Sequence, residues 1–183
     1  MGIGDYKTRA RVLTPSGYGY EQSGGICFLS IEKPGKMSIF AHTAASSPQL
    51  TFEMWRRRDI TPACVLQCEG AFHAVTDVTD LHDGKLTVQA VRLPFHKFSA
   101  KGAYIGEIAE LFAFVAEKYM AAPEDEFHTD EQETNILLTG KAVCLSLGDL
   151  LTRDDGTVWN VVKRYTSGEY RNEYEVVRYG SAR

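Results

Sequence analysis

The residues that could carry chemistry in this chain are its cysteines and histidines, and their spacing decides what they could do. Cysteines stand at positions 27, 64, 68 and 144, and histidines at 42, 73, 82, 96 and 128. Zinc sites usually combine two closely spaced ligand pairs, whereas Cys64 and Cys68 form a C-x3-C pair without a second one. In a reducing compartment we expect free thiols, with Cys64 and Cys68 on one buried face of an extended segment. No metal site and no cofactor is predicted.

Catalysis would require a nucleophile beside a base, or converging acids and histidines. The patterns H-x-H, H-E-x-x-H and G-x-S-x-G do not occur in the sequence. His73 follows Phe72 in a strand-like run, where an ordinary core or surface histidine is the simpler interpretation. His82 with Asp80 and Asp83 resembles a ligand cluster, but solvated turn residues are the simpler explanation. We therefore expect a protein that is not an enzyme.

Three arginines and an aspartate form a compact run of charge at positions 56–59. A nucleic-acid surface usually comes with a basic excess, whereas this chain has a net charge of −4 and a pI of about 5.7. Strand alternation would also separate Arg57 from Arg56 and Arg58, so no flat basic patch forms. Arginine pairs well with carboxylates and is enriched at interfaces. The sequence therefore predicts either salt bridges to acidic partners or a subunit interface, with Arg56, Arg57, Arg58 and Asp59 as the candidate interface residues.

The elements that must position these side chains are short strands. Apolar alternation predicts strands over residues 6–13, 26–31, 50–55, 64–68, 71–78 and 85–93, the last through Leu86, Val88 and Ala90. Glu69-Gly70 and Asp83-Gly84 supply turns, and the glycine-rich stretch 16–25 is expected to be a loop. Strands and turns at this spacing predict a mainly β fold, with a small antiparallel β-barrel over residues 1–97.

The pattern changes beyond Pro94. Apolar residues at 105, 108, 112, 115 and 119 recur at spacings of three and four, which predicts an amphipathic helix. Residues 121–134 are acidic and poor in apolar side chains, which is typical of a solvated loop. Strand patterns return over 135–145, 149–153, 157–165 and 173–179. We therefore expect a second domain over residues 98–183, made of a helix and a second β-rich part.

The two halves of the sequence resemble one another when one is shifted by 86 residues. Pro62 to Val65 falls on Gly148 to Leu151 without a gap, and Val75 falls on Val161. A tandem repeat of the barrel would produce this echo. Any two β-meanders could also produce it, because turns favour glycine and strands favour β-branched residues. The sequence alone leaves both explanations open.

One block of the sequence, Gln49 to Leu93, is similar to a known family. It reads QLTFEMWRRRDITPACVLQCEGAFHAVTDVTDLHDGKLTVQAVRL and resembles the head-closure, or head–tail connector (stopper), proteins of long-tailed bacteriophages. The features that carry the resemblance are a strand end leading into Arg-x-x-Asp-Ile, a Gly-x-aromatic-x-x-Val strand and a final apolar strand that ends in a charge. Here these are Thr51, Phe52, Arg56 to Arg58, Asp59, Ile60, Gly70, Phe72, Val75 and Val88 to Arg92. The resemblance extends more weakly back to Tyr6, and family members usually stop before residue 98.

The resemblance implies a structural protein of the virion neck. Such a barrel forms a homo-oligomeric ring beneath the portal, closes the DNA exit channel and offers a docking face to the tail. The implied partners are portal or adaptor proteins and tail proteins, with transient contact to packaged DNA. The implied location is the head–tail junction, after synthesis in the cytoplasm of a host bacterium. No membrane association is expected, because no apolar run approaches the length of a membrane span.

In this family a long loop between the second and third strands can project into the channel. The matching region here is about Pro34 to Pro48. The candidate channel or contact residues in it are Gly35, Lys36, Met37, Ile39 and Phe40. The alternatives are an ordinary mobile loop and a hairpin that continues the sheet.

Two other functions remain open from the sequence. A tail-terminator, tail-completion or distal-tail protein could be built from similar barrels. A cellular binding module of SH3-like or OB-like type is the other possibility, because OB-type surfaces interleave aromatic and basic residues. The nearest such set is Tyr165, Tyr170, Arg171, Tyr174 and Arg178.

Overall fold

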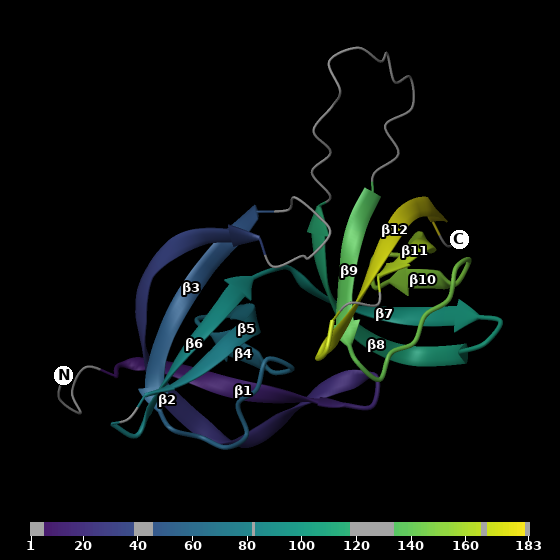
Figure 1. The fold of residues 1–183 in the computed structure, drawn as a ribbon. Helices are drawn as coiled ribbons and strands as arrows, with labels where there is room; N and C mark the ends of the chain where they lie inside the picture. The colour runs from purple at the N-terminus through teal and green to yellow at the C-terminus, as the bar shows by residue number, and fades with distance from the viewer. Residues whose placement is uncertain (1–5, 39–45, 82, 118–133, 166–167, 182–183) are drawn as a thin grey trace, which may run out of the picture. The chain divides into compact units, whose positions relative to one another are not determined.

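The computed structural model of this chain is all-β over the residues that it describes, which are 6–38, 46–81, 83–117, 134–165 and 168–181 (Figure 1). The described residues divide into two compact units, with the boundary between Pro94 and Phe95. The sequence analysis placed this boundary between residues 97 and 98. In the structure, the strand that begins at Phe95 already belongs to the second unit.

The first unit is a closed antiparallel barrel. Its strands are β1 (Thr8–Ser16), β2 (Gly19–Ser38), β3 (Ser46–Trp55), β4 (Val65–Cys68), β5 (Ala71–Leu81) and β6 (Lys85–Arg92). They pair in the order β1-β2-β3-β6-β5-β4, and β4 pairs back onto β1 from Ala10–Cys68 to Leu13–Val65. The small barrel predicted for this half is therefore confirmed.

The second unit is also a closed antiparallel barrel. Its strands are β7 (Phe95–Gly102), β8 (Gly106–Glu117), β9 (Thr134–Gly140), β10 (Leu150–Arg153), β11 (Thr157–Tyr165) and β12 (Arg171–Ser181). They pair in the order β7-β8-β9-β12-β11-β10, and β10 pairs back onto β7. Counted from the first strand of each unit, this order is the same as in the first barrel. The internal repeat is therefore present in the fold.

The repeat extends to the register of individual strand pairs. Val75 faces Ala90 in the first barrel, and Val161 faces Val176 in the second, each 86 residues later. Directly after each valine the register shifts by one residue, so that a β-bulge occupies the same place in both barrels. The β1–β2 and β7–β8 pairs also correspond at this offset, with Arg9 facing Phe28 and Phe95 facing Phe114.

The sequence comparison assumed a repeat without gaps, but the repeat in the structure does contain gaps. Cys64 accepts a backbone hydrogen bond from Val75, and the residue that accepts from Val161 is Asp149, 85 positions after Cys64. The turn between β4 and β5 holds two residues, Glu69 and Gly70, whereas that between β10 and β11 holds three, Asp154 to Gly156. The extra turn residue restores the offset of 86.

The predicted helix is wrong, because the region forms strand β8. A register shift in the β7–β8 pair lies where Phe98 faces Leu111 and Ala100 faces Ile108. Two residues of β8 lie between these positions against one residue of β7, which is a β-bulge. The bulge separates the inward-facing Ile108 and Leu111 by three positions instead of two. As a result, apolar residues recur at a spacing of three, which is also the spacing along one face of a helix.

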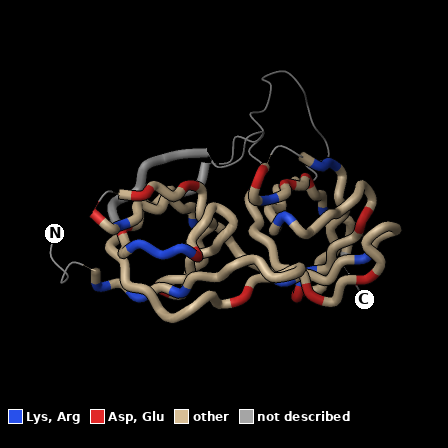
Figure 2. The backbone as a smooth tube through the Cα atoms, turned by 60° about the horizontal axis from the view of Figure 1, so that its bottom comes forward, with Lys and Arg blue, Asp and Glu red and all other residues tan. Residues whose placement is uncertain are grey.

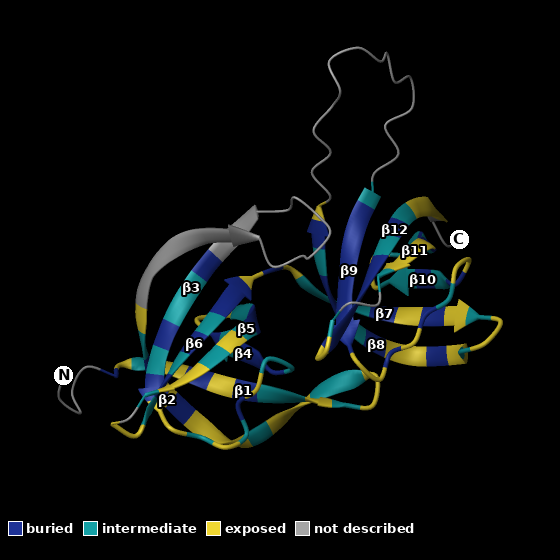
Figure 3. Ribbon diagram, viewed as in Figure 1, coloured by how far each residue is buried: buried dark blue, intermediate teal, exposed yellow. Residues whose placement is uncertain are grey.

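The core of each unit fills its own barrel, as the alternation of buried and exposed residues along the strands shows (Figure 3). Leu86, Val88 and Ala90 of β6 point inward as predicted, and so do Phe52 and Met54 of β3. The second core is built in the same way around side chains such as Leu137, Leu151, Trp159 and Tyr174. The stretch 16–25, which was expected to be a loop, is mostly strand. The turn between β1 and β2 consists of Gly17 and Tyr18.

Candidate interaction surfaces

The segment of the three arginines lies outside the sheet, because strand β3 ends at Trp55. Strand alternation therefore does not orient these side chains, contrary to the sequence-based expectation. Arg56 forms an ion pair of 2.7 Å with Asp80, and both side chains are largely exposed. Arg58 is exposed and has no ion pair within the described part of the chain. Arg56 and Arg58 are accessible to another molecule, whereas Arg57 has a different role.

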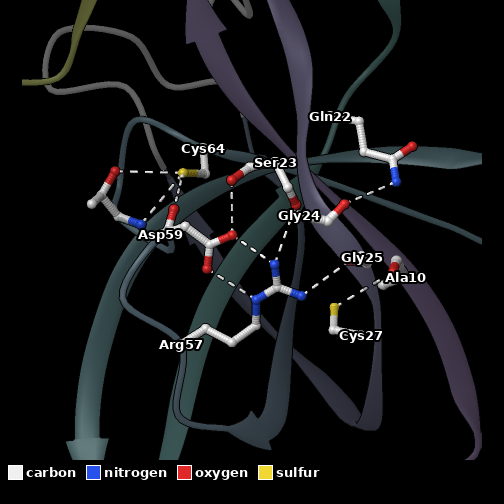
Figure 4. A network of polar contacts seen from close by, with 10 residues as sticks. Ala10, Gln22, Ser23, Gly24, Gly25, Cys27, Arg57, Asp59 and Cys64 are labelled. Carbon is white, nitrogen blue, oxygen red and sulfur yellow. Dashed lines mark hydrogen bonds and ion pairs between the residues drawn. The ribbon is translucent and has the colours of Figure 1, made fainter.

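Arg57 and Asp59 form an internal clamp on strand β2 (Figure 4). The guanidinium donates Nε to Oδ1 of Asp59 at 2.9 Å and Nη2 to Oδ2 at 2.6 Å. It also donates to the backbone carbonyls of Ser23 and Gly25, each at 3.2 Å. The Ser23 hydroxyl donates to Asp59 at 2.9 Å. The clamp uses most of the donors of Arg57, so this side chain fixes the barrel and is not free to bind a partner.

The clamp also sets the protonation state of its carboxylate. Hydrogen bonds from Arg57, followed by that from Ser23, hold the pKa of Asp59 below its usual range despite partial burial. Gly24, which lies beside the guanidinium, has a φ of +62°, in the left-handed region that favours glycine. A Cβ at this position would lie 2.9 Å from Nη2 of Arg57. The glycine-rich sequence therefore lets β2 pass close to the arginine.

Part of the predicted channel loop belongs to the sheet. Gly35, Lys36 and Met37 continue strand β2, where their backbone pairs with Gln49, Pro48 and Ser47 of β3. For these three residues, the structure agrees with the alternative of a hairpin that continues the sheet. Ile39 and Phe40 lie outside the described residues.

Of the residues examined for chemistry, Cys64, Cys68 and His73 are buried in the first barrel, Cys144 is exposed, and His82 lies outside the described residues. Cys64 and Cys68 both lie in the first core, as expected from their spacing. His73 is buried too, with its ring edge-on to Phe52 at 5.4 Å and Nδ1 at 3.4 Å from the Leu66 carbonyl. Burial lowers the pKa of His73 and raises that of Cys68 to about 11. A neutral imidazole beside a protonated thiol is suited to packing rather than nucleophilic chemistry.

Within the described residues, no group of three or more histidine, cysteine or acidic side chains is placed to hold a metal ion. The described part of the chain also contains no helix long and apolar enough to cross a membrane. Positive and negative residues are interspersed over both units, as Figure 2 shows.

The residues proposed for an OB-type surface do not form one exposed face. Tyr174 is fully buried, and its hydroxyl donates to the Val143 carbonyl at 2.8 Å. Arg171 is also buried, and Tyr165 donates its hydroxyl to Glu175 at 2.8 Å. Of the five, Tyr170 and Arg178 remain exposed. Successive bases could not stack on such a set, because stacking requires exposed aromatic faces.

The sequence reasoning missed a surface on the outside of β1 and β2, which we call the cationic–apolar face. It consists of Lys7, Arg9, Arg11, Ile26 and Phe28. The three cations alternate with inward residues and are all exposed. Ile26 and Phe28 are 41% and 50% exposed, although large apolar side chains of this kind are usually buried. Signals for it were present in the alternation of K-x-R-x-R at 7–11 and in ICF at 26–28.

The cationic–apolar face borders a shallow hollow of about 320 Å³. Arg9, Arg11 and Ile26 line it together with Gln67 and Glu69. Glu69 begins the β4–β5 turn and has a φ of +49°, followed by Gly70 at +74°, as in a type I′ turn. No ion pair joins this glutamate to either arginine in the described structure. The composition, arginine beside exposed apolar side chains, is that of protein–protein interfaces.

Comparisons with known proteins add little to these observations. No protein-family model and no curated protein matches the chain. One solved structure, titled "Structure of Bacillus subtilis Inhibitor of motility (MotI/DgrA)", aligns with 100% of this chain and 91% of its own, at 8% identity and a TM-score of 0.21. A TM-score this low carries no argument about the fold or the function.

Proposed function

We propose that this protein is a structural component of a bacteriophage neck, which joins the portal side of the head to the tail and closes the DNA channel as part of a ring. The proposal starts from the similarity of Gln49 to Leu93 to head-closure proteins. That block contains strands β3, β4, β5 and β6, so it supplies four of the six strands of a closed barrel. The family implies a small β-barrel of this kind.

The observation that carries the proposal furthest is the second barrel. Residues 98–183 had no counterpart in the family, which left their role open. Because the second barrel repeats the strand order of the first, the extra half is another module of the same type. We propose that each chain therefore supplies two barrels to the wall of the ring.

The chemistry of the described residues suits a role in assembly. No described group of side chains converges as a metal site, and the buried His73 and Cys68 have protonation states suited to packing. The net charge of −4, with both signs interspersed, suits a channel wall past which DNA slides without sticking (Figure 2).

Electron microscopy of virions that carry a gold-labelled copy of this protein would test the proposal. We expect label at the head–tail junction, and heads that contain DNA but lack tails when the gene is deleted. Label elsewhere on the particle would contradict a neck protein. Free tails of abnormal length after deletion would indicate a tail terminator instead.

A further inference from the structure

We propose that the cationic–apolar face of the first barrel binds the acidic segment 124–133 of a second copy of this chain. The inference rests on the ring assembly proposed above and names the contact that would link one copy to the next.

The cationic–apolar face carries charges that no described carboxylate neutralises. Lys7, Arg9 and Arg11 are exposed, and none has an ion pair within the described structure. Elsewhere in the same barrel, two cations have carboxylate partners: Arg56 pairs with Asp80, and Lys85 with Glu53 at 3.1 Å. Arg58, which has no ion pair among the described residues, lies outside the sheet. Three unpaired cations next to two exposed apolar side chains form a surface that suits an acidic partner with an apolar residue of its own.

The equivalent positions of the second barrel have a different character. At the offset of 86, Arg9 corresponds to Phe95 and Arg11 to Lys97, and Lys97 is paired with Glu110. Phe28 corresponds to Phe114, which is fully buried and packs against Phe95 with ring centroids 4.7 Å apart. In the second barrel, the equivalent cation is therefore paired and the equivalent phenylalanine is buried. Of the two barrels as the structure describes them, the first alone therefore carries such a surface.

The acidic segment has the composition that this face requires. Residues 124–133 carry six carboxylates, at positions 124, 125, 126, 130, 131 and 133, and no lysine or arginine. Phe127 lies among them in the sequence and supplies an apolar group for Ile26 and Phe28. This run of the chain therefore matches both components of the cationic–apolar face.

A chain with one acidic segment and one complementary face makes a head-to-tail contact. Such a heterologous contact leaves a free segment at one end of every assembly and a free face at the other. It therefore propagates until a rotation closes it into a ring. A self-complementary pair would stop at a dimer instead.

Complementary charge reversals test this contact directly. One variant, Arg9→Glu with Arg11→Glu, reverses the face, and another, Glu124→Lys with Asp125→Lys, Glu126→Lys and Asp130→Lys, reverses the segment, where four lysines then outnumber the two remaining carboxylates. Sizing with light scattering at low salt should show assemblies for the wild type and monomers for each variant alone. Each reversal should weaken self-association by about tenfold or more, because like charges then meet across the contact.

The mixture of the two variants is the decisive sample. The first variant retains an intact segment and the second an intact face, and the reversed face and reversed segment are complementary too, so the mixture should form assemblies that contain equal amounts of the two variants and that high salt dissociates. If the segment occupied the face within its own chain, the wild type would be a monomer and mixing would have no effect, which would overturn the inference. Assembly of the Arg9→Glu, Arg11→Glu variant like the wild type would overturn it as well.

Lys101→Glu with Arg164→Glu is the matched control, because it makes the same change in net charge at two exposed positions outside the face. This variant should assemble like the wild type, and loss of its assembly would show that net charge rather than this face controls self-association, which would overturn the inference. Circular dichroism checks that every variant is folded. The outcome is independent of the virion experiment. If the protein self-associated through this face but the label lay away from the neck, the proposed function would be contradicted and the contact would still be supported.

Discussion

Val75 and Val161 occupy the same position in two barrels, 86 residues apart along one chain. Val75 donates its backbone N–H to the carbonyl of Cys64 at 3.1 Å, and Val161 donates to that of Asp149 at 3.0 Å. Each valine faces an alanine or a valine across the sheet and precedes a β-bulge. Because barrel topology, register and bulge all recur together, a chance likeness of two meanders is a poor explanation of the sequence echo.

The clamp on strand β2 predicts a large difference between two neighbouring arginines. Arg57→Ala removes the bonds to Asp59 and to two backbone carbonyls, and leaves the half-buried carboxylate with the Ser23 hydroxyl as its remaining side-chain donor. We expect the free energy of unfolding of the first barrel to fall by about 1–3 kcal/mol. Urea titration followed by tryptophan fluorescence would measure it, with Trp159→Phe leaving Trp55 as the reporter of this barrel.

Arg58→Ala is the control for that experiment, because this side chain is exposed and has no ion pair in the described residues. Its effect should stay within about 0.5 kcal/mol. Equal losses for both variants would show that the clamp does not stabilise the barrel.

In the second barrel, the hydroxyl of Tyr174 holds the segment between β9 and β10. It accepts from the backbone of Leu145 at 3.0 Å and donates to Val143 at 2.8 Å, inside the core. Tyr174→Phe leaves the Leu145 N–H without this acceptor and should cost about 1–3 kcal/mol. Tyr179→Phe, at an exposed position, should leave the unfolding midpoint unchanged. A silent Tyr174→Phe variant would mean that the hydroxyl is dispensable.

Gly102 is expected to tolerate no larger residue, for a reason unrelated to backbone conformation. A Cβ there would overlap the carboxylate of Asp149, which is 2% exposed and accepts from the Ser146 N–H at 2.7 Å. Gly102→Ala should lower the thermal midpoint of the second barrel, by an amount equivalent to about 1–3 kcal/mol. Gly180→Ala meets no atom within 4 Å and serves as the comparison. Identical midpoints for the two variants would contradict this packing.

Burial of His73 predicts that the first barrel loses stability in mild acid. Burial lowers the pKa of this histidine in the folded protein, while the unfolded chain keeps a value near 6.5. Below about pH 6.5 the unfolded state binds a proton that the folded state does not, so the free energy of unfolding falls as the pH drops. His73→Asn should reduce this dependence between about pH 7.5 and pH 5.5.

His96→Asn is the control for the pH experiment. His96 lies in β7 of the second barrel, and burial lowers its pKa also. With Trp55 as the reporter, this variant should leave the slope of the first barrel unchanged. An unaltered slope in the His73 variant would assign the acid sensitivity to another group.

The first barrel should fold without the second. Its closure uses pairings among β1 to β6 alone, and its interior core is drawn from the same strands and the connection between β3 and β4. We expect a fragment of residues 1–94 to show a β-type circular dichroism spectrum and one cooperative unfolding transition. A fragment without a transition would mean that the barrel depends on the rest of the chain.

Sequence reasoning succeeded where one residue decides local structure. The turns at Glu69-Gly70 and Asp83-Gly84 and the alternation through Phe52 and Val88 were enough to predict the first barrel. It failed at β8, because a bulge changes which residues face inward and depends on the neighbouring strand. No pattern in β8 itself reveals such an event.

The candidate surfaces were harder to predict for a related reason. A run such as Arg56 to Arg58 is visible in the sequence, but the partner of Arg57 at Ser23 and Gly25 lies more than 30 positions away. The cationic–apolar face is assembled from two strands and becomes visible when Arg9 and Phe28 are paired. Only the register brings these residues together.

Closure of both barrels restricts how copies of this protein can meet. In a closed sheet each strand has a hydrogen-bonded neighbour on either side, so along the paired stretches no open edge is offered to a strand of another molecule. Along those stretches, contact between copies is made by side chains rather than by shared backbone ladders. Attraction of that kind responds to ionic strength and to single substitutions, and it does not template the uncontrolled stacking to which exposed edges are prone.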